Sequence, residues 1–452
     1  MICPSVFRDS LVLNGASNRQ YALLLLPFAT AKGPVASVPV CSLIRSSLIN
    51  RGFAPGLILA FALAVYLTAS VTSLPLALAV LPLVAGGLML SLVNSEDVDR
   101  VRLQHPRLLL ALSLFLISLA LTTILSYDPH SSLNACMVVS PGLLIAYMLT
   151  QLEDRYCDVF TWGLVGMVFT ASVVCIVMFL KSPYSDAGAV FYAGKTPALV
   201  VPNDMVLGVI FAPVVIQKIF SQKVLALKAF AVLTLLLLAS ALYLVKSRIC
   251  FLTGVVIFLL YLHHFHRKNF LGLLLLSVVA FVTVDFVAGL NIANDLILLL
   301  RENTRLSVWY AGFISVSQHP VVGYGPSQFY IAYEQVMATT SLPAWIMIDP
   351  RTVPWAHNMY LDALVERGVI GLFALLFLVY QIYIRLAERS DGSKGSRHYE
   401  LFAIYAAFIG FLFAGFFELT IQRIWVANGL FIFIGFAFMD SAKMESAADT
   451  GK

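Results

Sequence analysis

The chain has 452 residues, of which 60% are hydrophobic and only 12% are charged, and its formal net charge is +5. In soluble domains about a quarter of the residues are charged. This composition therefore excludes an ordinary soluble protein and indicates a polytopic membrane protein. The positive surplus is far below that of nucleic-acid-binding proteins, and we expect no nucleic-acid partner. The basic residues are better explained by membrane topology and by contacts with membrane lipids.

The six cysteines predict neither a disulfide framework nor a zinc site, because they form no C-x-x-C pair and most lie in apolar stretches. The histidines His263, His264 and His266 have a spacing that could bind a metal. Arg267 and Lys268 follow them, however, and a basic loop end beside anionic lipid explains the cluster more simply. We therefore predict no metal and no cofactor.

Residues 1–52 are mixed in character, and their one apolar run, 21–30, is too short to span a bilayer. We expect a cytoplasmic N-terminal tail there, with a misassigned start or a weak signal sequence as alternatives. A second cytoplasmic tail is expected at 441–452.

The remainder of the chain predicts an all-α fold with about twelve transmembrane helices, since a spanning helix needs about 20 apolar residues. Nine spans are expected within residues 53–289 and three within 367–440. Their predicted positions are 53–71, 74–93, 108–126, 133–150, 159–180, 198–217, 224–245, 248–264, 269–289, 368–386, 401–417 and 424–440.

The distribution of basic residues predicts the orientation of the chain. An even number of helices leaves both termini on one side of the membrane. Placing both termini in the cytoplasm puts twenty of the 29 Lys and Arg residues in cytoplasmic segments, in accord with the positive-inside bias. The long connection 290–366, between the ninth and tenth predicted helices, then lies on the outer face.

This long connection is expected to fold as a small helical cap on the membrane. Loops of such length usually carry function. Leu306, Trp309 and Phe313 have helical spacing, and His319 before Pro320 is expected to end that helix. The G-Y-G-P sequence that follows is typical of a structural turn.

Several cations predicted on the outer face could form one binding pocket for a phosphate or pyrophosphate, because arginine forks match phosphate oxygens. The alternative is that they bind lipid headgroups or snorkel to the interface. The candidates are Lys195 before the sixth predicted helix, Lys246 and Arg248 between the seventh and eighth, and Arg301, Arg305 and Arg351 in the long loop, with Asn203 and Asp204 at the start of the sixth helix.

His357 is the histidine with the clearest chemical potential. The sequence W-A-H-N-M-Y-L-D-A-L predicts that His357 and Leu361 share one face of a helix that enters the membrane, with Asn358 beside them. An imidazole can remove a proton from an attacking sugar hydroxyl near neutral pH. A histidine that is merely hydrogen-bonded at a helix start is the alternative that periodicity leaves open.

Three blocks follow one another within residues 305–372: R-L-S-V-W-Y-A-G-F, H-P-V-V-G-Y-G-P-S-Q-F and A-H-N-M-Y-L-D-A-L-V-E-R-G-V-I-G-L. Together with V-P-N-D at 201–204 and K-S-R at 246–248, this ordered set resembles the O-antigen ligase and polymerase superfamily of bacterial surface-polysaccharide enzymes. The expected helix count and the long outer loop between helices nine and ten also match that superfamily.

The resemblance implies a metal-independent, inverting glycosyltransferase of the bacterial inner membrane with its active site facing the periplasm. Its donor would be a glycan on undecaprenyl pyrophosphate, and its acceptor a sugar hydroxyl of lipid A core or of a growing polysaccharide. By motif position, His357 resembles the family's proposed base, and Arg248 and Arg305 resemble its pyrophosphate-binding arginines. One of the acids near the outer helix ends is expected to orient an arginine or His357; these acids are Asp204, Asp285 and Glu418.

The sequence leaves other functions open. Ligase and polymerase share donor and chemistry, and a third branch of the superfamily transfers glycans to protein hydroxyls. A transporter or flippase would also have twelve helices, but such folds predict internal repeats and broken midmembrane helices, which we do not find in the sequence. A non-catalytic envelope scaffold would not need His357 or the arginines.

Overall fold

The computed structural model divides the chain into two units, Met1–Gly52 and Phe53–Lys452. The structure describes only residues of the second unit. These are 63, 66, 105–137, 139–151, 154–181, 202–245, 247–266, 268, 270–272, 274–275, 279, 283, 304–344, 346–348, 353–393 and 395–439.

The described elements are helices without strands, which confirms the all-α fold class. The first group comprises α5 (Pro106–Ile124), α6 (Pro129–Met137), α7 (Ser140–Gln151), α8 (Asp154–Lys181), the 3-10 turn η2 (Pro202–Met205), α10 (Val206–Ser221), α11 (Leu225–Val245) and α12 (Arg248–Phe265). After them come α15 (Arg305–Gln318), α16 (Phe329–Thr339), α17 (Met359–Gly392), α18 (Gly395–Gly415) and α19 (Ile424–Phe438).

Membrane-spanning helices are confirmed: within the described part, 7 helical segments are long and apolar enough to cross a bilayer, one of them formed by α6 and α7 together, and α10 and α19 are shorter apolar helices. Nine of the predicted spans coincide with described helices. The other three, at 53–71, 74–93 and 269–289, fall almost entirely outside the described residues, so the count of twelve stays a prediction.

Two of the predicted spans are not single α-helices. The span expected at 198–217 begins as the 3-10 turn η2, and the α-helix α10 starts only at Val206. The span expected at 133–150 consists of two helices, α6 and α7, that meet near Pro141. Proline lacks a backbone N–H and clashes with the preceding turn, so it favours a new helix start over an unbroken one.

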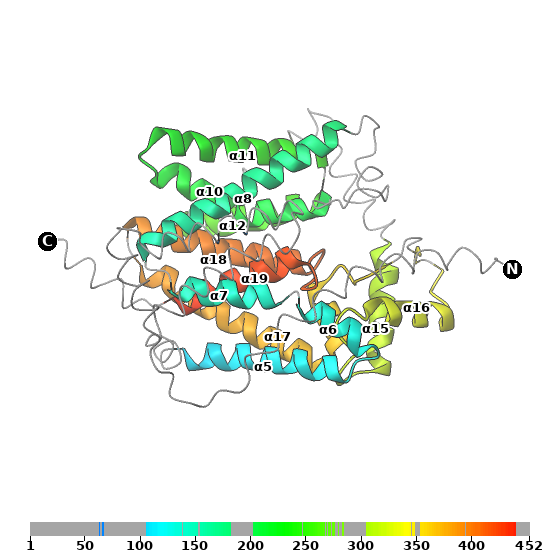
Figure 1. Ribbon diagram of the computed structural model, residues 1–452. Helices are drawn as coiled ribbons and strands as arrows, with labels where there is room; N and C mark the ends of the chain where they lie inside the picture. Colours follow the sequence, from blue (N-terminus) through cyan, green and yellow to red (C-terminus); the bar gives the residue numbers. More distant parts are fainter. Residues whose placement is uncertain are drawn as a thin grey trace, which may run out of the picture. The chain divides into compact units, whose positions relative to one another are not determined.

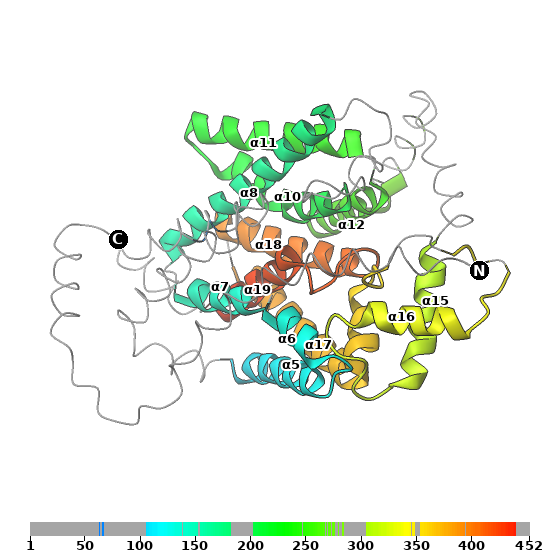
Figure 2. The same ribbon diagram turned by 45° about the vertical axis from the view of Figure 1, so that its right-hand side comes forward.

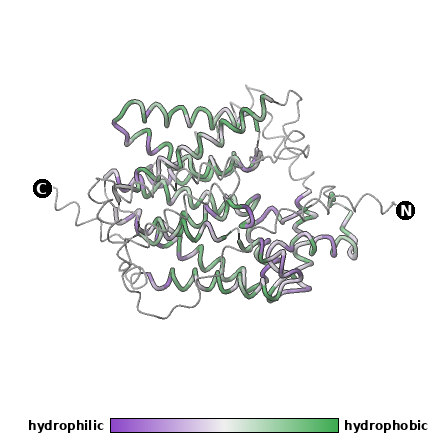
Figure 3. Tube along the Cα trace, viewed as in Figure 1, coloured by the Kyte–Doolittle hydropathy of each residue, from purple (hydrophilic) through white to green (hydrophobic). Residues whose placement is uncertain are grey.

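The long apolar helices lie side by side as a bundle, with α17 packed against α5 and α18, α10 against α18, and α19 against α7 (Figures 1 and 2). Apolar residues run along these helices, while polar residues gather toward their ends (Figure 3). One continuous cluster of buried side chains fills the bundle. Short connections join α10 to α11 and α18 to α19, and the two helices of each of these pairs run in opposite directions.

The part of the predicted cap that the structure describes is helical: α15 and α16 lie at one end of the bundle, with α15 running across the ends of the bundle helices (Figure 1). We call this the cap end. The cap has its own buried cluster, in which Val308 and Phe329 are fully buried. His319 ends α15 as expected, since it is the C-cap residue and its N–H donates to the carbonyl of Ser315.

A break in α17 joins the cap to the bundle. Gly368 has φ 62° and ψ −165°, a conformation that interrupts the helix and favours glycine. Backbone hydrogen bonds of 2.7 to 3.4 Å connect residues 365–370 with residues 320–325, so the peptide groups released by the break find partners. The G-Y-G-P sequence is therefore a structural turn, as predicted, and it docks on the broken helix.

Candidate functional site

The start of α17 fixes the position of His357. Asn358 is the N-cap residue, and its side-chain oxygen accepts hydrogen bonds of 3.0 Å from the backbone N–H groups of Tyr360 and Leu361. Asparagine is among the best N-cap residues, so the helix begins after it, at Met359. The prediction that His357 lies on a helical face with Leu361 is therefore wrong, because His357 precedes the helix and has a positive φ of 52°.

His357 and Arg305 meet at one carboxylate, that of Glu418. Nδ1 of His357 lies 3.3 Å from Oε1 of Glu418, and a guanidinium nitrogen of Arg305 lies 2.6 Å from Oε2. The Glu418 side chain is only 2% exposed, whereas His357 and Arg305 retain 20% and 26%. The acid is thus buried behind two groups that reach the solvent. Of the three acids expected to orient an arginine or His357, Glu418 contacts both.

The surroundings of Glu418 keep it ionised. Burial alone would raise the pKa of this carboxyl group, but the hydrogen bond and the electrostatic interaction with His357, together with the positive charges of Arg305 and Arg423, outweigh burial. The net result is a pKa below the ordinary value. An ionised Glu418 can hold the Nδ1–H of His357 and leave Nε2 as the nitrogen that accepts a proton.

A second ion pair lies beside the first. A guanidinium nitrogen of Arg423 donates to Asp204, and both side chains are largely buried. The guanidinium carbon of Arg423 also stands 4.7 Å from the centre of the Trp355 ring, and that ring contacts His357 edge-on at 5.9 Å between centroids. Asp204 thereby connects η2 with the loop that carries Glu418.

Arg248 is the first residue of α12 and is exposed. The start of α12 belongs to the same region, because α12 contacts η2, which contains Asp204. Among the other predicted residues, Asn203 lies in η2 and Asn358 caps α17. The described residues do not include Lys195, Lys246, Arg301, Arg351 or Asp285.

Sequence reasoning missed two members of this region and did not single out a third. Arg423 and Trp355 were not predicted as site residues, and Glu418 was one of three equal candidates. The available signal was position: Glu418 and Arg423 are charged residues in a short connection between two apolar helices. Charged residues in short connections commonly face solvent. Only the spatial contacts therefore distinguish Glu418 and Arg423 from ordinary surface residues.

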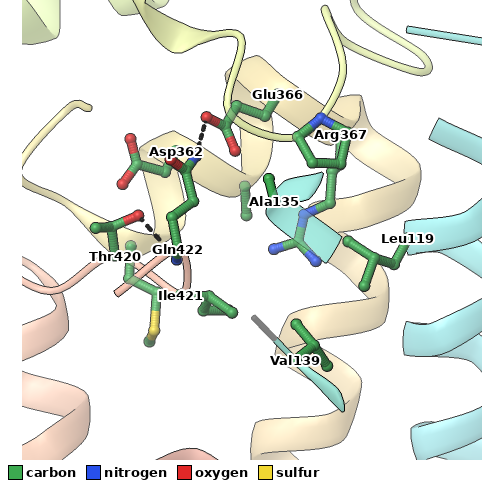
Figure 4. Close-up of a pocket in the computed structure, with 12 residues that line it drawn as sticks. Leu119, Ala135, Val139, Asp362, Glu366, Arg367, Thr420, Ile421 and Gln422 are labelled. Carbon is green, nitrogen blue, oxygen red and sulfur yellow. Dashed lines mark hydrogen bonds between the residues drawn. The ribbon is translucent and has the colours of Figure 1, made fainter. Parts of the chain in front are cut away.

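A layer of buried polar groups lies beneath His357, on the first turns of α17. Asp362, Glu366 and Arg367 are all at most 4% exposed and line a small cavity together with Thr420 and Gln422 (Figure 4). The cavity leaves about 30 Å³ for water-sized molecules, which is far too little for a sugar. These residues therefore support the site and do not receive its substrate.

Comparison with known families gives a match over part of the chain. The family model for O-antigen ligase matches residues 233–376. The match runs from α11 through the cap into α17; it includes Arg248, Arg305 and His357, whereas Glu418 lies beyond it. The comparison with curated proteins found no match. The resemblance to the O-antigen ligase superfamily is thereby confirmed over this part of the chain, and it supports a glycosyltransferase-type role in surface polysaccharide assembly.

Proposed function

We propose that this protein transfers a glycan from undecaprenyl pyrophosphate to an acceptor sugar hydroxyl at the periplasmic face of the bacterial inner membrane. The acceptor is lipid A core for a ligase, or a growing polysaccharide for a polymerase. The observation that carries the proposal is the contact of His357 and Arg305 with the buried Glu418 at the cap end. The arrangement places a general base, His357, near a cation, Arg305. Attack on a sugar pyrophosphate needs a base for the attacking hydroxyl and a cation for the leaving pyrophosphate.

In the proposed reaction His357 is the general base. Its Nδ1–H donates to Glu418, so Nε2 takes the proton of the acceptor hydroxyl while the hydroxyl oxygen attacks the anomeric carbon of the donor. The new glycosidic bond forms as the bond to the pyrophosphate oxygen breaks, and the electron pair leaves with the pyrophosphate. Direct displacement inverts the anomeric carbon. Glu418 stabilises the imidazolium that results.

The arginines bind the pyrophosphate. Pyrophosphate is already a good leaving group, so cations that neutralise its growing charge lower the barrier more than a general acid would. Arg305 and Arg248 are both exposed enough to meet an anion. Their guanidinium groups stay charged and match phosphate oxygens, so the proposal needs no metal ion. Lys195, Lys246 and Arg301 are proposed to add to this charge, with Asn203, Asp204, Arg351 and Asn358 in support.

The test is complementation of a deletion strain with wild type or with His357→Ala, Arg248→Ala or Arg305→Ala. We expect each variant to insert in the membrane at wild-type levels and to lose glycan transfer. Matched controls are His130→Ala, an exposed histidine of α6, and Arg397→Ala at the opposite end of the bundle, and both should retain transfer. Wild-type amounts of product from all three site variants would refute the assignment.

The glycans of the deletion strain identify the branch. Long chains that remain on the lipid carrier beside bare lipid A core would indicate a ligase. Single repeat units, on the carrier or on the core, would indicate a polymerase. Loss of glycan from proteins alone would indicate a protein O-oligosaccharyltransferase, and an unchanged profile would favour a transporter, a flippase or a scaffold.

A further inference from the structure

The backbone of His357 lies in a conformation that needs support. A φ of 52° falls in the left-handed region, which residues other than glycine adopt only at an energetic cost. Such a conformation persists only where neighbouring groups hold it in place. The groups that hold His357 therefore determine where its imidazole points.

The backbone of Ala356, the residue before His357, is held at both its N–H and its carbonyl. The N–H of Ala356 donates to Oδ1 of Asp362 at 2.6 Å, and its carbonyl accepts from the indole Nε1–H of Trp309 at 2.9 Å. Ala356 is fully buried, so bulk water does not compete for its N–H or its carbonyl. Asp362 supplies this contact from the first turn of α17, six residues along the chain.

The loop that carries Glu418 is fastened to the same face of α17. Glu366 lies one helical turn after Asp362, and its carboxylate accepts from the side-chain amide of Gln422 (Figure 4). Gln422 follows Glu418 by four residues in the connection between α18 and α19. Asp362 and Glu366, on one face of α17, thus hold two segments, one carrying His357 and the other carrying Glu418. The side chains of His357 and Glu418 contact each other.

We propose that Asp362 and Glu366 are positioning residues: through Ala356 and Gln422 they fix the His357 backbone and the Glu418 loop relative to each other. Neither acid touches the substrate, since the cavity they line admits only water-sized molecules. The inference rests on the proposed function, because it assigns them to the alignment of the catalytic base. Displacement of a catalytic group by about 1 Å can reduce a rate about 100-fold.

The test compares Asp362→Ala with Asp362→Asn in the deletion strain, with glycan transfer and thermal unfolding in detergent both measured. Alanine removes the acceptor for the Ala356 N–H, and we expect transfer to fall about 100-fold. Asparagine keeps an oxygen at that position and should restore transfer to within about threefold of wild type. Ser315→Ala, which removes a buried hydrogen-bonding group from the cap without touching Ala356, is the control and should retain transfer.

A double variant separates positioning from general stability. If Asp362 acts by aligning His357 with Glu418, then Asp362→Ala should add little to the loss caused by Glu418→Gln. If the double variant loses transfer by the product of the two single losses, the inference is overturned. Full transfer by Asp362→Ala, measured beside an active wild type, would also overturn it. An inactive wild type would instead refute the proposed function.

A second variant covers the case in which Asp362→Ala does not fold. Trp309→Phe keeps an aromatic ring but removes the N–H that binds the carbonyl of Ala356, and we expect about a tenfold loss of transfer. Trp162→Phe is its control, because the indole N–H of Trp162 has no hydrogen-bond partner within the described part of the chain. Equal transfer by these two tryptophan variants would overturn the positioning role.

Discussion

At the scale of single residues, Glu418 is the group on which the site depends. One buried carboxylate contacts a histidine and an arginine through its two oxygens. Removing Glu418 would leave the partly buried side chains of Arg305 and His357 beside each other without a counter-charge. The energetic penalty of an unpaired charge generally exceeds the net value of the pair that held it.

Glu418→Gln should therefore lose glycan transfer by about 100-fold or more, because a neutral amide cannot stabilise an imidazolium. Transfer is measured from the surface glycans of a complemented deletion strain. Glu388→Gln is the control, since Glu388 pairs with Arg385 at the exposed opposite end of α17 and should leave transfer unchanged. Retention of at least half the transfer by Glu418→Gln would contradict the role of this carboxylate.

The same carboxylate should make stability depend on pH. The pKa of Glu418 is lower in the folded protein than its ordinary value of 4.5, so its ionised form stabilises the fold above that value. This contribution should vanish as the pH falls through the lowered pKa. The melting temperature of wild type minus that of Glu418→Gln should thus be positive at neutral pH and shrink below about pH 4. A difference that grows in acid would contradict the assignment.

Sequence reasoning found the proposed catalytic and pyrophosphate-binding residues more readily than their partners. His357, Arg248 and Arg305 occur in recognisable blocks within the matched range. Glu418 lies 61 residues after His357, and no local pattern can pair residues across that separation. The conformation of His357 was also mispredicted, because helical periodicity extends across a cap residue whose side chain actually starts the helix.

At the scale of elements, the break in α17 is the feature that the hydropathy pattern could not reveal. Apolar windows locate spans by composition, and they predicted a span from 368 without the helical turns that precede it. The structure shows one element, Met359–Gly392, that is interrupted at Gly368 and held by the turn at 320–325. The buried acids lie on the turns before the break, so the break separates the supporting layer from the lipid-exposed helix.

Gly368→Ala should destabilise the protein by at least about 2 kcal/mol, since alanine at positive φ is strained and its Cβ would lie 2.2 Å from the carbonyl oxygen of Val321. Thermal unfolding of the purified protein in detergent measures this change. Gly392→Ala, in the same helix and with nothing within 4 Å of the added carbon, is the matched control. It should be neutral or stabilising by up to about 1 kcal/mol. Equal melting of the two variants would show that the break is not required.

At the scale of the whole bundle, the connections place two sets of loops at opposite ends. The joint before α12, the cap and the loop with Glu418 lie at the cap end, whereas the turn between α10 and α11 and the turn between α17 and α18 lie at the other. The sequence predicted this alternation from span lengths alone. Which end faces the periplasm still rests on the bias of basic residues.

Cysteine labelling tests that orientation. In a background whose six native cysteines are replaced by alanine, Ser317→Cys places an exposed thiol at the cap end and Lys223→Cys places one at the opposite end. An impermeant maleimide should label Ser317→Cys in intact cells and Lys223→Cys only after lysis. The reverse pattern would put His357 in the cytoplasm, on the side away from the exported lipid-linked glycan. The proposed transfer reaction would then be untenable even if every contact around Glu418 were correct, because chemistry at a membrane depends on the side that the site faces.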